Sequence, residues 1–172
     1  ASVERDYSLA RLTTVRTGGP ADYFARPATQ DDLAALLAWA EKESIPVGMV
    51  GSGSNLLVAD DGFRGLAMKL GGALTEVERD GTHLRCGGGA RLPSVAGKTP
   101  GWGLAGLEFG VNIPGTVGGA VRMNAGAYGR EVVDILVEAT LVLRDGSIER
   151  WPLDRLGYSY RHSAVPAGAV AV

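Results

Sequence analysis

The sequence is short of the residues that form disulfides and bind zinc. Its 172 residues include one cysteine, Cys86, and two histidines, His83 and His162. One cysteine cannot close an intrachain disulfide, and so few scattered Cys and His residues cannot assemble a clustered zinc site. We therefore predict neither a disulfide framework nor a metal site. Cys86 is expected to be a buried, inert thiol, and His83 a surface residue of a hairpin.

The chain also lacks an excess of charge of one sign and long apolar runs. Its 17 basic and 19 acidic residues are interspersed and leave a net charge of −2. Without a basic stripe, nucleic acid is a poor candidate partner. No run reaches the about 18 apolar residues of a membrane span, and the N-terminal residues lack the plan of a signal peptide. These absences predict a soluble, cytoplasmic protein without a membrane partner. We expect a monomer, although the sequence does not itself give the oligomeric state.

Glycine, in contrast, is abundant. The chain has 26 glycines in 172 residues, about 15% against a usual share of roughly 7%. No triplet repeat accompanies them, and 45% hydrophobic residues suffice for a core. The densest stretch, Ile113–Gly129, carries almost no charge. Because glycine has no Cβ and lets a ligand approach the main chain, this stretch predicts backbone-mediated ligand binding.

A helix and a following strand lead into a second glycine-rich loop. Apolar residues recur at helical spacing over residues 30–43, behind a capping box of Thr29 and Asp32. Pro46 ends this helix, and residues 47–50 have the character of a short buried strand. The strand runs into Gly51–Asn55, where consecutive N–H groups can converge on an anion.

Two hairpins are predicted in the second half. Residues 75–79 and 82–86 flank Asp80-Gly81, which favours a type I′ turn, and residues 137–144 and 147–151 repeat the plan around Asp145-Gly146. With one clear helix, these hairpins favour an α+β fold with largely antiparallel sheet. We place a boundary between residues 1–59 and 60–172. Because apolar residues continue to Val172, we expect the second part to be incomplete at its C-terminus.

Two nucleotide-binding motifs match only formally. Gly101-Trp-Gly-Leu-Ala-Gly106 fits G-x-G-x-x-G, but no strand leads into it and no acidic residue follows about 20 positions later. Gly97-Lys98-Thr99 resembles the end of a P-loop, yet Leu92 stands where the first glycine is required. Pro100 would also obstruct the helix that should follow a P-loop. Neither motif supports a Rossmann fold or a P-loop.

Five segments are distinctive in combination. They are Leu12–Ala21, Val50–Val58, Gly106–Glu108, Ile113–Gly129 and Tyr160–Ser163. In content and order they resemble the UDP-N-acetylenolpyruvoylglucosamine reductases, bacterial flavoenzymes of cell-wall synthesis with the vanillyl-alcohol-oxidase type of FAD fold. The resemblance covers essentially the whole chain. It implies a two-lobed FAD-binding domain with mixed and antiparallel sheets and flanking helices, in the bacterial cytoplasm, and it implies that the family's substrate-binding domain is absent from this chain.

The resemblance divides the cofactor between the two glycine segments. It sets Gly51, Ser52, Gly53, Ser54 and Asn55 against the FAD diphosphate, which needs convergent N–H donors, and it adds Leu56 to the cofactor-binding residues. It wraps a second set around the ribityl and isoalloxazine parts: Ile113, Pro114, Gly115, Thr116, Gly118, Gly119, Ala120, Asn124, Ala125, Gly126 and Ala127. A flat ring needs close main chain and polar groups along its edge, which glycines and the Asn124 amide offer. Thr116 has an alternative role as the cap of a short helix, and the two roles are compatible.

The resemblance also implies an active-site role for Arg161 of the Tyr-Arg-x-Ser motif. A guanidinium fork suits the carboxylate of the implied substrate, an enolpyruvyl ether of a UDP-sugar, and would stabilise the enolate formed during reduction. Tyr128 and Tyr160 are expected substrate neighbours. The alternative for Arg161 is a surface salt bridge, and the alternative for the two tyrosines is core packing with a satisfied hydroxyl.

The implied reaction uses NADPH as co-substrate, which reduces the flavin before hydride passes to the enolpyruvyl double bond. The proton-donating Ser and its partner Glu in this family belong to the substrate-binding domain, so they lie beyond Val172. Two other functions stay open from the sequence. One is an FAD-binding module without catalysis, and the other is an oxidase of the same fold that acts on another substrate.

Overall fold

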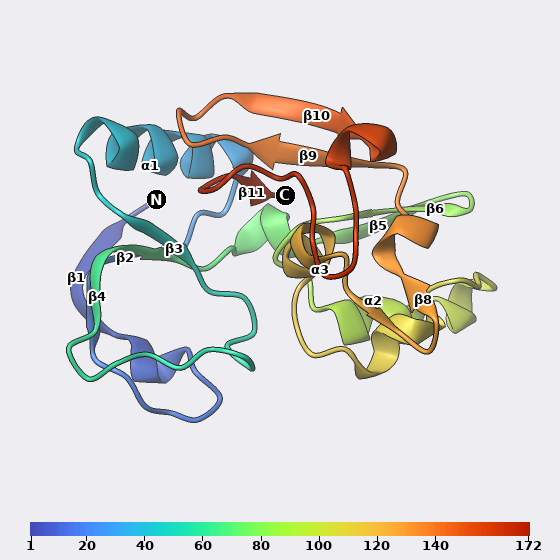
Figure 1. The fold of residues 1–172 in the computed structure, drawn as a ribbon, viewed down its shortest axis with the longest axis horizontal. Coiled ribbons are helices and arrows are strands. Elements are labelled where there is room, and N and C mark those ends of the chain that lie inside the picture. Colours follow the sequence, from blue (N-terminus) through green and yellow to red (C-terminus); the bar gives the residue numbers. More distant parts are fainter.

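A four-stranded mixed sheet forms the N-terminal lobe (Figure 1). The computed structural model describes residues 1–172. In this sheet the strand order is β1-β2-β4-β3, with β1 antiparallel to β2 and with β4 parallel to both β2 and β3. The strands are β1 Val3–Ser8, β2 Pro20–Ala25, β3 Val47–Met49 and β4 Phe63–Met68. Because β4 lies between β2 and β3, this sheet extends past Ala59, the residue at which the sequence analysis ends the first lobe.

Helix α1, Gln30–Lys42, is confirmed within one residue of its predicted end. Thr29 caps it, because its Oγ1 accepts the Asp32 N–H at 3.1 Å. Half of the predicted capping box differs, since the Asp32 carboxylate accepts the N–H of Ala28 at 3.1 Å instead of that of Thr29. A cap of this kind contributes about 1 kcal/mol. The apolar face of the helix is buried, which agrees with its predicted spacing: Leu33, Leu36, Leu37 and Ala40.

The C-terminal lobe combines a three-stranded antiparallel sheet with two separate two-stranded hairpins, β5–β6 and β7–β8, and two short helices (Figure 1). The sheet has the order β10-β9-β11. The elements of this lobe are β5 Val77–Asp80, β6 His83–Cys86, α2 Leu92–Lys98, α3 Val117–Met123, β7 Gly126–Ala127, β8 Arg130–Glu131, β9 Glu138–Val142, β10 Ile148–Pro152 and β11 Val170–Ala171. Single 3₁₀ turns cover Leu9–Arg11, Gly72–Thr75, Pro100–Trp102, Glu108–Asn112, Val132–Asp134 and Leu153–Leu156. The two predicted hairpins are present, and the expectation of largely antiparallel pairing is confirmed: only the pairs of β4 with β2 and with β3 are parallel.

The turn of the β5–β6 hairpin differs from the predicted type I′ turn. Asp80 pairs with His83, so the two-residue loop is Gly81-Thr82 and not Asp80-Gly81. Of these two residues only Gly81 has a positive φ, 60°. A type I′ turn needs positive φ at both positions, whereas a type II′ turn needs it at the first alone. His83 is exposed, as predicted.

The β9–β10 hairpin has a longer loop than the prediction gave it. The N–H of Leu143 donates to the Ser147 carbonyl at 2.8 Å, which leaves three residues in the loop. Gly146 closes it with φ 86° and donates its N–H to the Leu143 carbonyl at 3.0 Å. This is the arrangement of a turn followed by a left-handed glycine bulge. Asp145 stabilises it by accepting the Ser147 N–H at 2.9 Å.

A shared core joins the two lobes. In Figure 1, α1 lies above the N-terminal sheet and close to the β9–β10 hairpin. The buried cluster under α1 includes Leu66 and Met68 of β4 together with Val142 of β9 and Val170 of β11. Arg144 adds a polar link, because its guanidinium donates to the Glu41 carboxylate at 2.5 Å and to the Ile45 carbonyl at 2.6 Å. The lobes therefore form one packed body.

Two further features concern residues named in the sequence analysis. Cys86 is half-buried instead of fully buried, and burial raises the pKa of its thiol. Helix α2 ends at Lys98 and a 3₁₀ turn begins at Pro100, because proline cannot continue an α-helix. None of the helices combines the length and the apolar character that crossing a bilayer requires.

Candidate functional site

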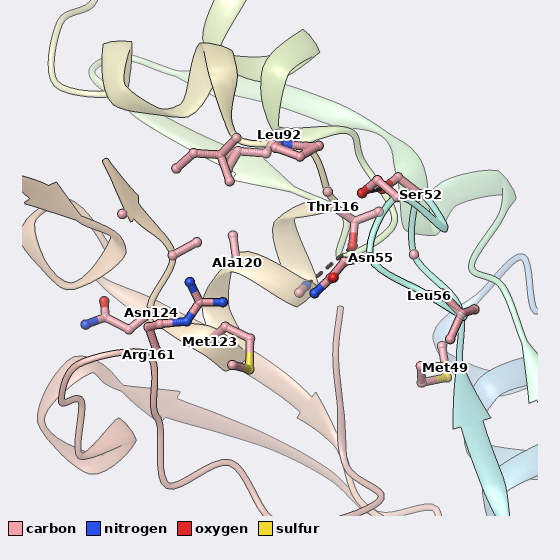
Figure 2. A pocket seen from close by; sticks show the side chains of 18 of the residues that line it. Met49, Ser52, Asn55, Leu56, Leu92, Thr116, Ala120, Met123, Asn124 and Arg161 are labelled. Carbon is pink, nitrogen blue, oxygen red and sulfur yellow. Dashed lines mark hydrogen bonds between the residues drawn. The ribbon is translucent and has the colours of Figure 1, made fainter. Parts of the chain in front are cut away.

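A cavity of about 390 Å³ lies between the loop after β3 and helix α3 (Figure 2). It brings together the two glycine segments that the sequence analysis singled out. The predicted residues that line it are Gly51, Ser52, Gly53, Ser54, Asn55, Leu56, Ile113, Pro114, Gly115, Thr116, Gly119, Ala120, Asn124, Ala125, Gly126, Tyr160 and Arg161. Five further lining residues were not predicted: Met49, Val50, Leu92, Met123 and Glu131. Of the predicted set, Gly118, Ala127 and Tyr128 lie outside this cavity.

The loop Gly51–Asn55 presents free backbone donors. None of its five N–H groups has an acceptor within the protein. Its bend depends on Gly53, whose φ of 70° lies in the left-handed region. The Gly53 carbonyl accepts the Thr14 N–H at 3.0 Å, which ties the loop to the segment after β1. The hydroxyls of Ser52 and Ser54 lie 2.9 Å apart at the exposed side of the loop. This donor set suits a diphosphate.

Helix α3 approaches this loop through its first turn. Thr116 caps the helix and accepts the Gly119 N–H at 3.4 Å, while its side chain also lines the cavity. The two roles considered for Thr116 are therefore compatible in the structure. A Cβ added to Gly51 would lie 3.3 Å from Thr116 Oγ1, so the two glycine segments are in close contact across the cavity.

Gly118 lies on the opposite side of α3. Its N–H donates to the Gly88 carbonyl at 2.8 Å, and a Cβ at this position would lie 2.8 Å from the carbonyl oxygen of Ala171. The glycine is thus required for close packing of α3 on the neighbouring backbone. Its surface faces a second cavity, of about 370 Å³.

The second cavity adjoins the first, and the two share Met49, Val50, Gly51, Thr116 and Gly119. Lys69 and Arg122 add positive charge to its wall. Burial lowers the pKa of Lys69, and the positive charges of Arg26 and Arg91 lower it further. Sequence reasoning missed this cavity, because its wall combines the end of β4 with residues 88–89 and 168–171, which are distant in sequence. Glycine pairs such as Gly88-Gly89 were the available signal.

The amide of Asn124 is engaged inside the protein. The residue is 1% exposed and ends α3 in the left-handed region, with φ 43°. Its Nδ2 donates to Glu131 at 2.9 Å and to the Ser159 carbonyl at 3.2 Å, and its Oδ1 accepts the Val133 N–H at 3.0 Å. In Figure 2 this amide points away from the cavity. The structure thus gives it a different use from the flavin-edge contact expected from sequence.

Arg161 extends its guanidinium into the cavity toward α3 (Figure 2). It occupies a tight turn in which Ser159 and His162 exchange N–H to carbonyl hydrogen bonds of 3.1 Å each. Its φ is 52°, a conformation unusual for a residue with a Cβ. No carboxylate lies within salt-bridge distance of it, so the alternative of a surface ion pair is not what the structure shows. Tyr160, in the same turn, is 82% exposed.

Tyr128 lies at the tip of the short β7–β8 hairpin, beside the cavity-lining Gly126. Both loop residues, Tyr128 and Gly129, have positive φ, 56° and 76°, which is the signature of a type I′ turn. The ring is 81% exposed, and its hydroxyl accepts a hydrogen bond from Asn112 Nδ2 at 3.4 Å. Core packing is therefore excluded as its role.

Fold and cavities define the class of protein: a two-lobed domain with a cavity between a donor-rich loop and a glycine-rich helix start, an arrangement typical of domains that bind a nucleotide cofactor. The chain belongs to the FAD binding domain family, whose model matches residues 21–151. FAD is therefore the cofactor of this domain. The free N–H donors of Gly51–Asn55 suit its diphosphate, and both cavities adjoin this loop.

Two curated relatives are about half identical in sequence to the chain over the aligned residues. The UDP-N-acetylenolpyruvoylglucosamine reductase of Rhizorhabdus wittichii is 50% identical over 165 residues, which cover 95% of this chain and 54% of the relative. The enzyme of the same name from Sphingopyxis alaskensis is 51% identical over 165 residues, covering 95% and 55%. The chain thus spans about half the length of the curated relatives that it matches.

Solved structures show the same fold. The crystal structure of UDP-N-acetylenolpyruvylglucosamine reductase (MurB) from Thermus caldophilus is 34% identical, with a TM-score of 0.82 over 99% of this chain and 59% of that one. A vanillyl-alcohol-oxidase-type flavoprotein from Myceliophthora thermophila is 17% identical, with a TM-score of 0.63 over 89% and 31% of the two chains. The prediction of a two-lobed α+β FAD-binding domain of this type is confirmed.

Proposed function

We propose that this chain is the FAD-binding part of an NADPH-dependent reductase that converts the enolpyruvyl ether of UDP-N-acetylglucosamine to UDP-N-acetylmuramate in the bacterial cytoplasm. Relatives about 50% identical that carry the reductase name support this function. The observation that carries it is Arg161, a cation without a carboxylate partner that points into the cavity. Residues that donate protons to the substrate would belong to the part of the relatives that this chain does not span.

Three regions of the site would hold FAD. The N–H groups of Gly51–Asn55 would bind the diphosphate, with Leu56 beside them. The main chain from Ile113 to Ala120 and from Ala125 to Ala127 would line the ribityl and isoalloxazine parts. The second cavity, with Lys69 in its wall, would receive the adenosine. Gly118 and Asn124 would act through packing and hydrogen bonds that shape this slot.

Arg161 would bind the substrate carboxylate. When bound, FAD supplies the redox chemistry, because it accepts a hydride from NADPH and transfers it to the enolpyruvyl double bond. Negative charge then develops on the carboxylate, and a fixed guanidinium fork stabilises this charge more in the transition state than in the ground state. Tyr160, which lines the cavity, and Tyr128 are both largely exposed and would contact the substrate.

The two lobes would place the cofactor and the substrate relative to each other. We propose that residues 1–59 and 60–172 form the two lobes, except that strand β4 of the second segment belongs to the sheet of the first lobe. The cofactor would lie between the loop of the first lobe and α3 of the second, with substrate arriving at the Arg161 end. A monomer suffices for this arrangement, because both walls of the cavity come from one chain.

An absorbance titration of the complete protein tests the function. The purified protein is expected to show flavin bands, which NADPH bleaches and the UDP-sugar enolpyruvyl ether restores under anaerobic conditions. Bleaching without recovery on addition of substrate would contradict the proposed reaction. Recovery by oxygen alone would favour an oxidase. The matched variant is Arg161→Lys, in which a point charge replaces the fork; it should keep the flavin bands and lose most of the substrate-driven recovery.

A further inference from the structure

Both ends of the turn that carries Arg161 are attached to the last turn of α3. At one end, Asn124 Nδ2 donates to the Ser159 carbonyl at 3.2 Å. At the other end, the buried hydroxyl of Ser163 donates to the Arg122 carbonyl at 2.6 Å. Between these anchors, Tyr160 and Arg161 form a two-residue loop with little contact of its own, because Tyr160 is largely exposed. The orientation of the turn therefore depends on the two anchors.

Asn124 is well suited to be the directing anchor. It is almost completely buried and has both N–H groups in use, one on Glu131 and one on Ser159. Its Oδ1 is held by the Val133 N–H, so the amide cannot rotate without losing three hydrogen bonds. A buried amide with every N–H satisfied fixes the groups that it joins. The left-handed φ of Arg161 adds a reason for such a constraint, since this conformation persists only where the surroundings determine it.

We infer that Asn124 is a positioning residue: through the Ser159 carbonyl, it holds the Tyr160–Arg161 turn so that the Arg161 guanidinium faces the flavin slot. The inference rests on the proposed function, which makes Arg161 the group that binds the substrate carboxylate. The amide of Asn124 points away from the cavity (Figure 2), so it would act on the reaction only through Arg161. A displacement of a charged group by about 1 Å can lower the reaction rate roughly a hundredfold. Loss of the hydrogen bond that holds the Tyr160–Arg161 turn is therefore expected to slow the reaction strongly.

Two variants separate positioning from simple folding. Asn124→Asp loses both N–H donors and sets its carboxylate against that of Glu131, so it is expected to lower stability and to release the turn. The double variant Asn124→Asp/Glu131→Gln restores the contact between positions 124 and 131 with donor and acceptor exchanged, and its carboxylate at position 124 still accepts the Val133 N–H. Neither variant can donate to the Ser159 carbonyl. The double variant therefore removes the contact between two carboxylates without recovering the anchor.

The measurement uses the complete, FAD-loaded protein, with its thermal midpoint as the measure of folding and two further readouts. Trypsin cleavage after Arg161 reports opening of the turn without reference to activity, and losing one hydrogen bond should accelerate it by up to roughly tenfold. Stopped-flow absorbance separates flavin reduction by NADPH from reoxidation by the enolpyruvyl substrate. In the double variant we expect the thermal midpoint to rise above that of Asn124→Asp, flavin reduction to be unchanged, and reoxidation to stay roughly tenfold to a hundredfold slower than in wild type. Asp145→Asn, in the remote β9–β10 turn, is the control and should leave both readouts unchanged.

Each result decides the inference. If the double variant recovers reoxidation together with stability, or if reoxidation slows while cleavage after Arg161 does not change, Asn124 does not position Arg161. If the wild-type protein is not reoxidised by the substrate but the double variant still shows faster cleavage after Arg161, the proposed reaction fails and the anchoring role stands.

Discussion

Gly53 lies so close to the carbonyl oxygen of Leu12 that a Cβ on the glycine would overlap that oxygen. The obstacle is backbone, which cannot swing aside as a flexible side chain would, and φ at Gly53 is 70°. The loop that we assign to the diphosphate thus owes its shape to a contact with the segment after β1. Gly53→Ala is expected to displace this loop and to lower FAD affinity at least about tenfold, with loss of stability.

The matched control for this substitution is Gly97→Ala in helix α2. A Cβ at Gly97 would meet no atom within 4 Å. Alanine favours helix over glycine by about 1 kcal/mol, so this variant should be at least as stable as wild type and should bind FAD normally. Fluorescence titration of the apoprotein with FAD measures the affinity of both variants. Equal affinity of the two would show that the Gly53 loop does not hold the cofactor.

Arg161→Gly should stabilise the fold while it abolishes function. Arginine at φ 52° costs about 1–2 kcal/mol relative to an unstrained conformation, and glycine removes that cost. Arg16 supplies the comparison, because it is exposed and has φ 55° but lies outside both cavities. Arg16→Gly is expected to raise the thermal midpoint to a similar extent and to leave turnover unchanged. If only Arg161→Gly loses turnover, the strained backbone at this position is tolerated because the reaction needs the arginine side chain.

Tyr158 has a buried hydroxyl without a hydrogen-bond partner, although its ring packs against the core of the second lobe. A buried unsatisfied group costs about 1–3 kcal/mol, so Tyr158→Phe should stabilise the protein by roughly that amount in urea unfolding. Tyr160→Phe is the control for stability, since the Tyr160 side chain is exposed and its hydroxyl can bind water. A decrease in stability for Tyr158→Phe would mean that its hydroxyl has a bound partner.

The same residue gives a pH dependence. Burial raises the pKa of Tyr158 in the folded protein, whereas in the unfolded chain it ionises near pH 10. Above about pH 10 the unfolded state therefore binds fewer protons than the folded state, and the stability falls as pH rises. Unfolding free energies measured from about pH 8 to 11 should decline less steeply for Tyr158→Phe than for wild type. Parallel curves would contradict this contribution.

Arg144 links the C-terminal end of α1 to the β9–β10 hairpin through hydrogen bonds to Glu41 and to the Ile45 carbonyl. Hydrogen bonds to a charged group contribute about 1.5–3 kcal/mol, so Arg144→Ala should lower the free energy of unfolding by about 2–4 kcal/mol. Arg150 pairs with Glu138 at 3.4 Å on the surface, and Arg150→Ala should change stability by less than about 1 kcal/mol. Equal effects would remove Arg144 as an interlobe link.

Local patterns in the sequence predicted local structure well. Apolar spacing and a cap residue define α1, and turn residues located the two hairpins within one or two residues of their observed ends. The turn types were wrong because they depend on which residues pair, and pairing at Asp80 and Leu143 is decided by the strands. The placement of β4 inside the first sheet involves partners about 20 and 40 residues away, and no local pattern encodes that.

The site was predictable to the extent that its segments are distinctive. Glycine-rich composition located both walls of the first cavity, and the resemblance to a flavoenzyme family supplied Arg161. The internal bonds of Asn124 could not be foreseen, since they depend on Ser159 and Glu131 reaching it from two other segments. Nor could the contact of Gly118 with Gly88 and Ala171, where the function of the glycine is to let backbones meet.

The core shared by Leu66 and Met68 with Val142 and Val170 also determines how the cofactor can enter. Domains that close on a ligand usually rotate about a hinge between separate cores, but here rotation of one lobe would separate residues of both lobes that pack in one shared cluster. We therefore expect the cavity between the Gly51–Asn55 loop and α3 to keep a fixed width, so that FAD enters and leaves through its open side. Such a site releases its cofactor slowly, so the protein should remain yellow through extensive dialysis and lose its colour only on unfolding.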